Sequence, residues 1–214
     1  MAQRTIHYLI GEELIRSGAV RDVDRFRIGN VLPDAIARID DRYITHYQKR
    51  VVEHGRTVRY SDFERFRRDF AALVESDDLY LGYYMHLIED ACYRRLWARI
   101  GLKGRVVTNE EIERLHQDYH LLNAFTVRRW GLRDELVFPE RFETEPIGRI
   151  YPFLLRDFLE EMHGDFLEHP EGETFYITEA DIELFVEESR DFLLDTLRRM
   201  RSGAAPLDPR ELAW

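Results

Sequence analysis

The stretch that most constrains the fold runs from Leu79 to Asp90 and reads LYLGYYMHLIED. Its first ten residues include no Asp, Glu, Lys or Arg, and apolar side chains would fall on every face of a helix formed by them. A helix that is apolar all round is normally buried in the core of a soluble protein. The stretch is too short, and too soon followed by charges, to span a membrane. The sequence therefore predicts a buried central helix.

Two polar side chains lie inside this predicted helix. His86 and Asp90 are four residues apart, and that spacing puts both side chains on one helical face. An ionised carboxylate is costly to bury unless it is paired or binds a metal. Asp90 therefore requires a partner, and we expect His86 to be either that partner or a second ligand of one metal ion.

The whole chain has the size and composition of one globular domain. Its 214 residues can bury a substantial core, and the single cysteine, Cys92, allows no intramolecular disulfide framework. The formal net charge of −10 argues against nucleic acid, or an anionic membrane, as a stable partner held by bulk electrostatics. No window reaches transmembrane length, and Glu12 and Glu13 interrupt the apolar run that a signal peptide would need. We expect a cytoplasmic protein.

Helical periodicity of the apolar residues dominates the chain, whereas Pro and Gly are scarce. Ser61 is a suitable N-cap for one helix, and capping-box patterns at Thr108 and Thr178 mark the starts of two others. The expected helices cover about residues 5–17, 22–28, 61–73, 78–100, 109–130, 150–163 and 179–201.

Extended structure is expected in only two places. The runs 48–52 and 57–60 would pair as a small β-hairpin around a turn at His54-Gly55, and one short strand is expected at 175–177. We therefore predict an all-α fold: a single multi-helix domain over residues 1–201, with one small hairpin. A loosely held tail is expected at residues 202–214.

Five side chains are candidate metal ligands. Imidazole and carboxylate groups together suit zinc, iron or manganese. His86 and Asp90 would come from one rigid helix, and Asp34 and His46 from irregular segments that precede it. His7 is the fifth candidate, because it lies early on an apolar helix.

Each candidate also has a purely structural interpretation. A histidine such as His86, taken alone, is more often a hydrogen-bonded core residue than a ligand, and Asp90 could bond His86 and nothing more. Asp34 follows Pro33 and would serve as a turn residue or an N-cap. His46 alone says little. Spacing by itself leaves both the metal site and the structural cluster open.

Three short motifs occur in a set order along the chain. They are Gly29-x-x-x-Pro33-Asp34, Thr45-His46-Tyr47 and Gly82-x-x-x-His86-x-x-x-Asp90. Together they resemble the zinc-dependent phospholipase C family in order and approximate spacing, over roughly residues 5–130. The family is all-α, so the resemblance implies the phospholipase C / P1 nuclease fold.

The resemblance also implies a ligand set. Asp34, His46, His86 and Asp90 would form one metal site, Asp90 would bridge to a neighbouring metal, and His7 would join that second ion. Zinc is the implied ion, with iron or manganese as alternatives.

The chain departs from the family at two points. The secreted members ligate a metal with a mature N-terminal Trp, whereas this chain starts Met1-Ala2-Gln3. Their third metal uses further His and Glu residues, for which the nearby candidate is His116-x-x-x-His120, a pair that also fits a solvated surface. We therefore expect a reduced, intracellular relative with one or two metal ions.

The expected function is metal-dependent hydrolysis of a small-molecule or lipid phosphoester by a metal-activated water. Asp34 is the candidate catalytic residue, as a ligand that also takes the proton from that water. Tyr47, Tyr83 and Tyr84 would line the substrate cleft or pack in the core, and core packing is favoured for Tyr84. Arg42 and Lys49 would meet a phosphate or remain solvated charges.

Two alternatives stay open. One is an HD-type metal-dependent phosphohydrolase, although the chain has no adjacent His-Asp pair and the nearest equivalent is Glu89-Asp90. The other is a non-enzymatic helical binding module in which His86 and Asp90 form a structural contact.

Overall fold

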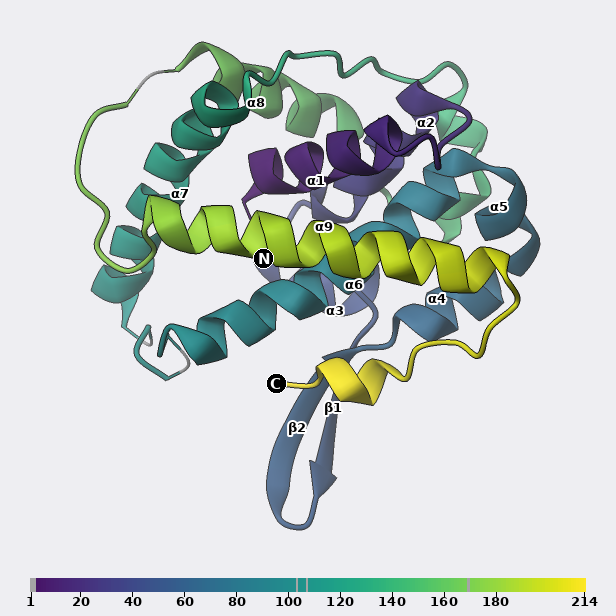
Figure 1. Cartoon of the computed structure of the whole chain (residues 1–214), viewed down its shortest axis with the longest axis horizontal. Coiled ribbons are helices and arrows are strands. Elements are labelled where there is room, and N and C mark those ends of the chain that lie inside the picture. Colours follow the sequence, from purple (N-terminus) through teal and green to yellow (C-terminus); the bar gives the residue numbers. More distant parts are fainter. Residues whose placement is uncertain (1–2, 103, 107, 169) are drawn as a thin grey trace.

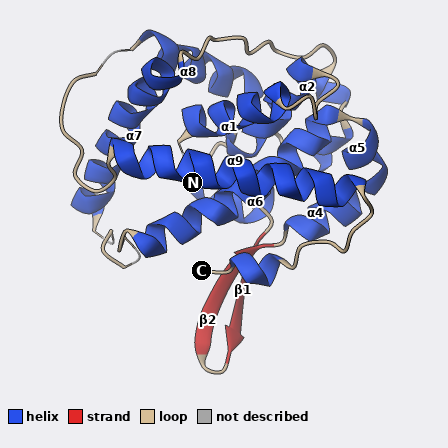
Figure 2. Cartoon of the chain, viewed as in Figure 1, coloured by secondary structure: helices blue, strands red, loops and turns tan. Residues whose placement is uncertain are grey.

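The computed structural model describes residues 3–102, 104–106, 108–168 and 170–214, so Met1 and Ala2 of the Met1-Ala2-Gln3 start lie outside the described residues. Within these ranges the chain forms nine α-helices and a single two-stranded sheet (Figure 1, Figure 2). The prediction of an all-α fold with one small hairpin is confirmed. In the described part of the chain, no helix is both long and apolar enough to cross a bilayer.

The elements follow one another in a simple order. The helices are α1 (Arg4–Arg16), α2 (Val23–Val31), α3 (Arg42–Thr45), α4 (Phe63–Asp69), α5 (Ala71–Ser76), α6 (Asp78–Arg99), α7 (Asn109–Trp130), α8 (Leu155–Leu167) and α9 (Glu179–Arg201). The strands are β1 (Gln48–Glu53) and β2 (Arg56–Ser61). Single 3₁₀ turns are η1 (Leu32–Asp34), η2 (Ile39–Asp41), η3 (Phe142–Thr144), η4 (Pro146–Arg149) and η5 (Pro209–Leu212).

Helix α6 forms the centre of the molecule, as the sequence predicts. Every residue from Asp78 to Ala91 is buried. In Figure 1, α6 lies in the middle of the helical body, and the long helix α9 crosses in front of it. Asp77 caps α6 by accepting a hydrogen bond from the backbone N–H of Leu79. The uncharged run thus buries all faces of the helix rather than one stripe.

Helices α2 and α6 meet with their backbones in contact. A Cβ atom on Gly29 would lie 1.9 Å from the carbonyl oxygen of Leu79, and one on Gly82 would lie 2.3 Å from that of Phe26. Both distances are shorter than any real Cβ contact, so only glycine fits at either position. Since η1 follows α2 directly, this close approach fixes Asp34 relative to the central helix.

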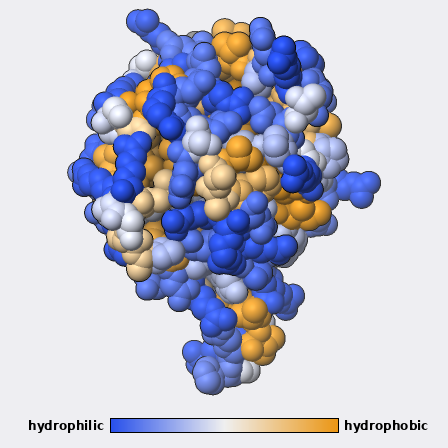
Figure 3. All heavy atoms as spheres, turned by 90° about the vertical axis from the view of Figure 1, so that its right-hand side faces the viewer, coloured by the Kyte–Doolittle hydropathy of each residue, from blue (hydrophilic) through white to orange (hydrophobic). Residues whose placement is uncertain are grey.

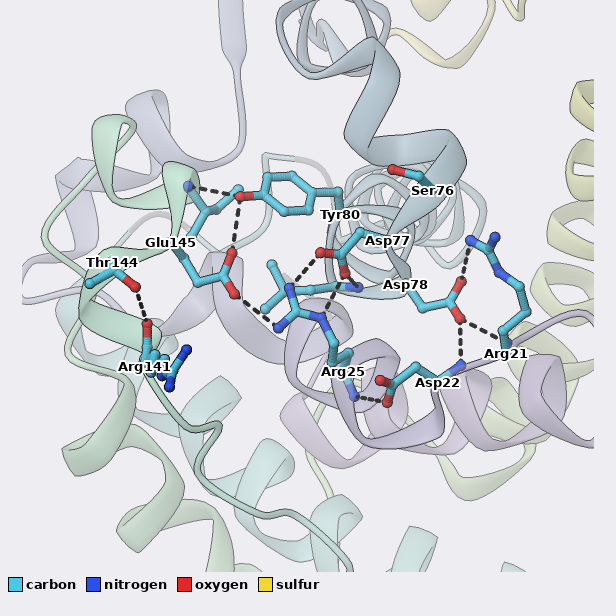
Figure 4. Close-up of polar contacts among 12 residues, drawn as sticks. Arg21, Asp22, Arg25, Ser76, Asp77, Asp78, Tyr80, Arg141, Thr144 and Glu145 are labelled. Carbon is cyan, nitrogen blue, oxygen red and sulfur yellow. Dashed lines mark hydrogen bonds and ion pairs between the residues drawn. The ribbon is translucent and has the colours of Figure 1, made fainter.

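A polar network fastens the start of α2 to the start of α6 (Figure 4). The guanidinium of Arg25 donates to both carboxylate oxygens of Asp77, at 2.7 and 2.6 Å. The carboxylate of Asp78 accepts the backbone N–H groups of Arg21 and Asp22 at 2.8 and 2.6 Å. These charge-assisted bonds hold the two helices in the orientation that their glycines permit.

The hairpin is formed as predicted. Its strands pair antiparallel from Gln48 opposite Ser61 to Glu53 opposite Arg56. The turn residues His54 and Gly55 both have positive φ, at 50° and 75°, which is typical of a tight two-residue hairpin turn. The hairpin projects from the helical body in Figure 1 and shows apolar surface on one side in Figure 3.

The expectation of a loosely held tail is wrong. Trp214 and Arg59 exchange two backbone hydrogen bonds, at 2.9 and 3.2 Å, so the end of the chain pairs with β2. The guanidinium of Arg94 also lies 5.6 Å from the centre of the Trp214 ring. These contacts fasten the end of the chain to the hairpin and to α6.

Other boundaries differ from the predictions for local reasons. Ser61 ends β2 and donates to the backbone oxygen of His46, and Asp62 caps α4 instead. The predicted helix over 61–73 is split into α4 and α5, because Phe70 has a non-helical φ of −125°.

Two predictions in the second half of the chain are wrong. The helix expected over 150–163 begins only at Leu155, since Pro152 precedes it within a segment that has no regular secondary structure. Residues 175–177 form no strand, because their three backbone N–H groups all donate to the carboxylate of Asp118 on α7.

Candidate metal centre

The five predicted ligands converge on one buried point. His7 comes from α1, Asp34 from η1, His46 from the end of α3, and His86 and Asp90 from α6. His7 and His86 are wholly buried, and the other three side chains are at most 6% exposed. They form two groups of three with ligand atoms within 4.8 Å of one another, one of His7, Asp34 and His86 and one of His46, His86 and Asp90.

The ring of His86 is held in one orientation by the backbone. Its Nδ1 lies 2.8 Å from the carbonyl oxygen of Asn30. A carbonyl only accepts, so Nδ1 carries the hydrogen and the neutral ring keeps a free electron pair on Nε2. Burial, reinforced by the charge of His7, lowers the pKa of His86 to about 3, which favours this neutral form. His86 therefore presents to the cluster a nitrogen that could bind a metal.

The other two imidazoles also have an outer neighbour at Nδ1, in both cases a side chain. Nδ1 of His46 lies 3.0 Å from Oγ1 of Thr45, and Nδ1 of His7 lies 3.0 Å from Oε1 of Glu89. In each case Nε2 is left facing the two aspartates. An outer partner on one ring nitrogen, with the other nitrogen directed inward, is typical of metal-binding histidines.

The distances between the inward-facing atoms match those of ligands around one small cation. Nε2 of His46 lies 3.2 Å from Nε2 of His86, 3.1 Å from Asp34 and 3.6 Å from Asp90. Nε2 of His7 lies 3.6 Å from Asp90 and 3.8 Å from Asp34. Tetrahedral ligands at ~2.0–2.1 Å from a zinc ion would lie ~3.3 Å apart.

Several of these buried polar atoms have no hydrogen-bond partner in the described structure. They are both ring nitrogens of His7, Oδ1 of Asp34 and both carboxylate oxygens of Glu89. The 3.0 Å contact of His7 with Glu89 has the distance of an ion pair but not the alignment of a hydrogen bond. Buried polar groups are almost always satisfied. A cation would satisfy the inward-facing atoms, so the residues present fit a bound metal.

The charges around the centre favour a cation. Burial opposes ionisation of Asp34, but the close contact with His46 and the charges of the nearby imidazoles hold the pKa of Asp34 well below its usual range. Burial also raises the pKa of Glu89. For His7, burial alone would lower the pKa, yet the charge of Glu89 raises it to about 9. Three carboxylates, counting Asp90, therefore compete for positive charge in a small volume.

Glu89 is the residue that sequence reasoning missed. It is wholly buried on α6 and contacts His7, whereas the sequence-based prediction considered it only as the neighbour of Asp90. The signal was present, because Glu89 follows His86 by three residues and so shares its face. It is also a second acidic residue beside an uncharged run, and its burial there calls for a partner.

A surface cleft of about 680 Å³ leads to this centre. Of the five candidate ligands, Asp34 alone lines it among the described residues, together with Arg42 and Tyr119. His116 and His120 are exposed on its wall, and His120 lies 3.4 Å from Glu168. In the part of the chain that the structure describes, neither histidine joins a group of three potential ligands.

The tyrosines expected at the cleft lie elsewhere. Tyr83 donates its hydroxyl hydrogen to the backbone oxygen of Thr45 and is wholly buried, so it helps to position the His46 segment. Tyr47 and Lys49 line a different surface hollow, and Lys49 is paired with Asp62 at 2.6 Å. Of the two cations that were expected to meet a phosphate, Arg42 and Lys49, it is Arg42 that lines the cleft.

Comparison with known proteins adds no relative. No family model matches the chain, and no match was found among curated proteins or solved structures. The resemblance to the zinc-dependent phospholipase C family therefore stays a prediction. The residues of the centre itself carry the functional proposal.

Proposed function

We propose that this protein is a metal-dependent hydrolase that cleaves phosphoesters, with zinc as the best-suited ion. One observation carries the proposal: three imidazole Nε2 atoms and two aspartates, from four separate elements, face one buried point next to a cleft. Mixed imidazole and carboxylate sets of this kind suit zinc, and also iron or manganese.

The candidate ligands divide into two sets that share members. His46, His86, Asp34 and Asp90 would hold one ion, and His7 with Asp90 would hold a second. A divalent ion bound there supplies Lewis acidity, which makes water more acidic and polarises a phosphoryl oxygen. Glu89, Thr45 and the backbone of Asn30 keep the three rings in position.

Asp34 is the proposed proton acceptor. Its side chain is 4% exposed, and it is the candidate ligand that borders the cleft within the described residues. Its pKa is held below its usual range, so the carboxylate is ionised at neutral pH and can bind a cation. It would accept the proton of an attacking water that a bound ion makes more acidic. The cleft has the volume of a small-molecule site, which suits a compact phosphoester or the headgroup of a lipid.

An HD-type phosphohydrolase is the second candidate. The chain lacks an adjacent His-Asp pair, but His46 and Asp34, from separate elements, lie 3.1 Å apart at the same centre. The two candidates share the metal chemistry and differ in substrate. Turnover of nucleoside monophosphates, with no turnover of phosphodiesters, would favour the HD-type enzyme.

The proposal is tested by metal content and hydrolysis together. Untagged protein is analysed by inductively coupled plasma mass spectrometry and assayed with bis(p-nitrophenyl) phosphate and p-nitrophenyl phosphate. We expect near-stoichiometric metal and activity in the wild type. Asp34→Ala and His86→Ala should lose both, whereas His116→Ala serves as the matched control and should keep both.

Two results would contradict the proposal. Full metal retention in Asp34→Ala and His86→Ala would remove these residues from the site. No metal after reconstitution, with a melting temperature unchanged by a chelator, would favour a non-enzymatic binding module.

A further inference from the structure

Arg42 is an unusual cation in this molecule. It opens the short helix α3, one turn before His46, and its side chain borders the cleft beside Asp34. Its Nε atom is buried and makes no hydrogen bond in the described structure. A guanidinium is normally buried only with a carboxylate or another acceptor.

Other partly buried arginines in the chain do have such partners. Arg25 pairs with Asp77 at 2.6 Å, and Arg27 pairs with Glu12 at 2.6 Å. The ion pairs among the described residues do not include Arg42, although charged aspartates lie nearby. Arg42 thus retains its donors for a group that enters the cleft.

A second arginine, Arg94, acts electrostatically on Arg42 but does not line the cleft. Arg94 lies one turn after Asp90 on α6, and its Nε is also buried without a hydrogen-bond partner in the described structure. Its guanidinium packs against the rings of Trp97 and Trp214, at 5.0 and 5.6 Å. Burial lowers the pKa of Arg42, the charges of Asp34 and Asp90 raise it, and the charge of Arg94 lowers it further. Each arginine lies one helical turn from a candidate ligand.

We infer that Arg42 binds the anionic phosphoryl oxygens of the substrate next to Asp34. An incoming oxyanion would satisfy the buried Nε donor of Arg42. The planar guanidinium fork matches two phosphate oxygens. The inference rests on the proposed function and narrows its substrate class to phosphoesters that keep an ionised oxygen, namely monoesters and diesters rather than neutral triesters.

The test measures binding of inorganic phosphate by isothermal titration calorimetry, separately from turnover. Zinc-reconstituted wild type is compared with Arg42→Met, which removes the charge, and Arg42→Lys, which keeps it without the fork. Lys49→Met is the matched control, because Lys49 is paired with Asp62 outside the cleft. Metal content and the melting temperature are recorded for every variant.

We expect Arg42→Met to weaken phosphate binding by about 10–100-fold, the loss typical of a hydrogen bond to a charged group. Arg42→Lys should weaken it less, and Lys49→Met should leave it unchanged, all with unchanged metal content. Phosphate affinity in Arg42→Met equal to that of the wild type would overturn the inference. Loss of metal in both Arg42 variants would also overturn it, because Arg42 would then support the ligands.

Failure of the proposed function gives a different pattern. If the wild type holds no metal, the same titration on the metal-free protein still reports on Arg42. If the metal-free wild type binds phosphate and Arg42→Met abolishes the binding, the result would support an anion site at Arg42 without the hydrolase. If the metal-free wild type binds no phosphate, both the anion site and the hydrolase would be contradicted.

Discussion

Two helices carry a pair of potential ligands with the same spacing and opposite surroundings. His86 and Asp90 on α6 are buried, at 0% and 5% exposure, whereas His116 and His120 on α7 are exposed. Nδ1 of His86 is fixed by a backbone carbonyl, whereas His120 has a contact with the exposed side chain of Glu168. The four-residue spacing therefore shows only that two side chains share a face. Burial and fixed outer partners distinguish a candidate metal centre from a solvated pair.

Helices α6 and α7 also differ in how closely they pack against the rest of the molecule. Helix α6 touches the backbone of α2 through Gly29 and Gly82, and that contact brings Asp34 and Asn30 to His86. The exposed histidines of α7 line the wall of the surface cleft instead. The predictions below test whether this contrast determines metal binding.

The largest expected effect is the loss of zinc affinity when His86 is removed from the buried pair. Removal of His120 from the exposed pair is the comparison. His86→Ala should reduce zinc affinity at least ~100-fold, because even outer-shell substitutions cost up to that factor. His120→Ala should leave it unchanged, since its ring is exposed. Competition with a chromophoric chelator measures both affinities. Equal losses in the two variants would erase the distinction between the pairs.

The glycine contact is tested with two glycine-to-alanine substitutions. Gly82→Ala should lower the free energy of unfolding by about 3 kcal/mol, because the new Cβ would overlap the backbone of α2. Gly164→Ala, in α8, meets nothing within 4 Å and should raise stability by about 0.5–1 kcal/mol. Urea denaturation gives both values. A neutral Gly82→Ala variant would show that the helices need not touch there.

The pH dependence of the stability of metal-free protein tests the charges of the buried groups. Burial alone would lower the pKa of His7, but the charge of Glu89 raises it from 6.5 to about 9. The folded protein thus holds this proton more tightly than the unfolded chain. The resulting stabilisation, up to about 3 kcal/mol, is fully present below pH 6.5 and is lost as the pH rises through 9.

Denaturation of metal-free protein across this range provides the measurement. His7→Gln should flatten the curve, whereas the substitution His116→Gln on the exposed pair should not. A wild-type curve that stays level between pH 6.5 and 9 would show that His7 keeps its ordinary pKa.

The smallest effect concerns the outer partners. Glu89→Gln should lower metal affinity by about 10–100-fold, since Glu89 orients His7 without facing the metal. Glu168→Gln, beside the exposed His120, is the matched control and should change nothing. The same chelator competition distinguishes the two. A larger loss in Glu168→Gln would place the metal on α7.

Much of the fold could be predicted because its signals are local. The uncharged run gave the buried helix α6, and the capping boxes at Thr108 and Thr178 gave the starts of α7 and α9. The turn at His54-Gly55 gave the hairpin. All five candidate ligands lie close together in the structure, and their binding of a metal stays a prediction.

The remainder depends on long-range contacts that no local pattern reports. Residues 175–177 look like a strand but serve as donors to Asp118, which lies 57 positions from Phe175. The tail is held by Arg59 of the hairpin. Glu89 contacts His7, which lies far from it in the sequence. This contact depends on the packing of α1 against α6, which no local pattern reports.

An anomalous-difference map from crystals of untagged protein, collected above the zinc absorption edge, tests the central claim most directly. We expect one or two peaks at ~2.0–2.2 Å from the facing atoms of His46, His86, Asp34, Asp90 and His7. No peak should lie beside His116 and His120. A centre that shows no peak after reconstitution, with direct hydrogen bonds among these side chains, would contradict the account.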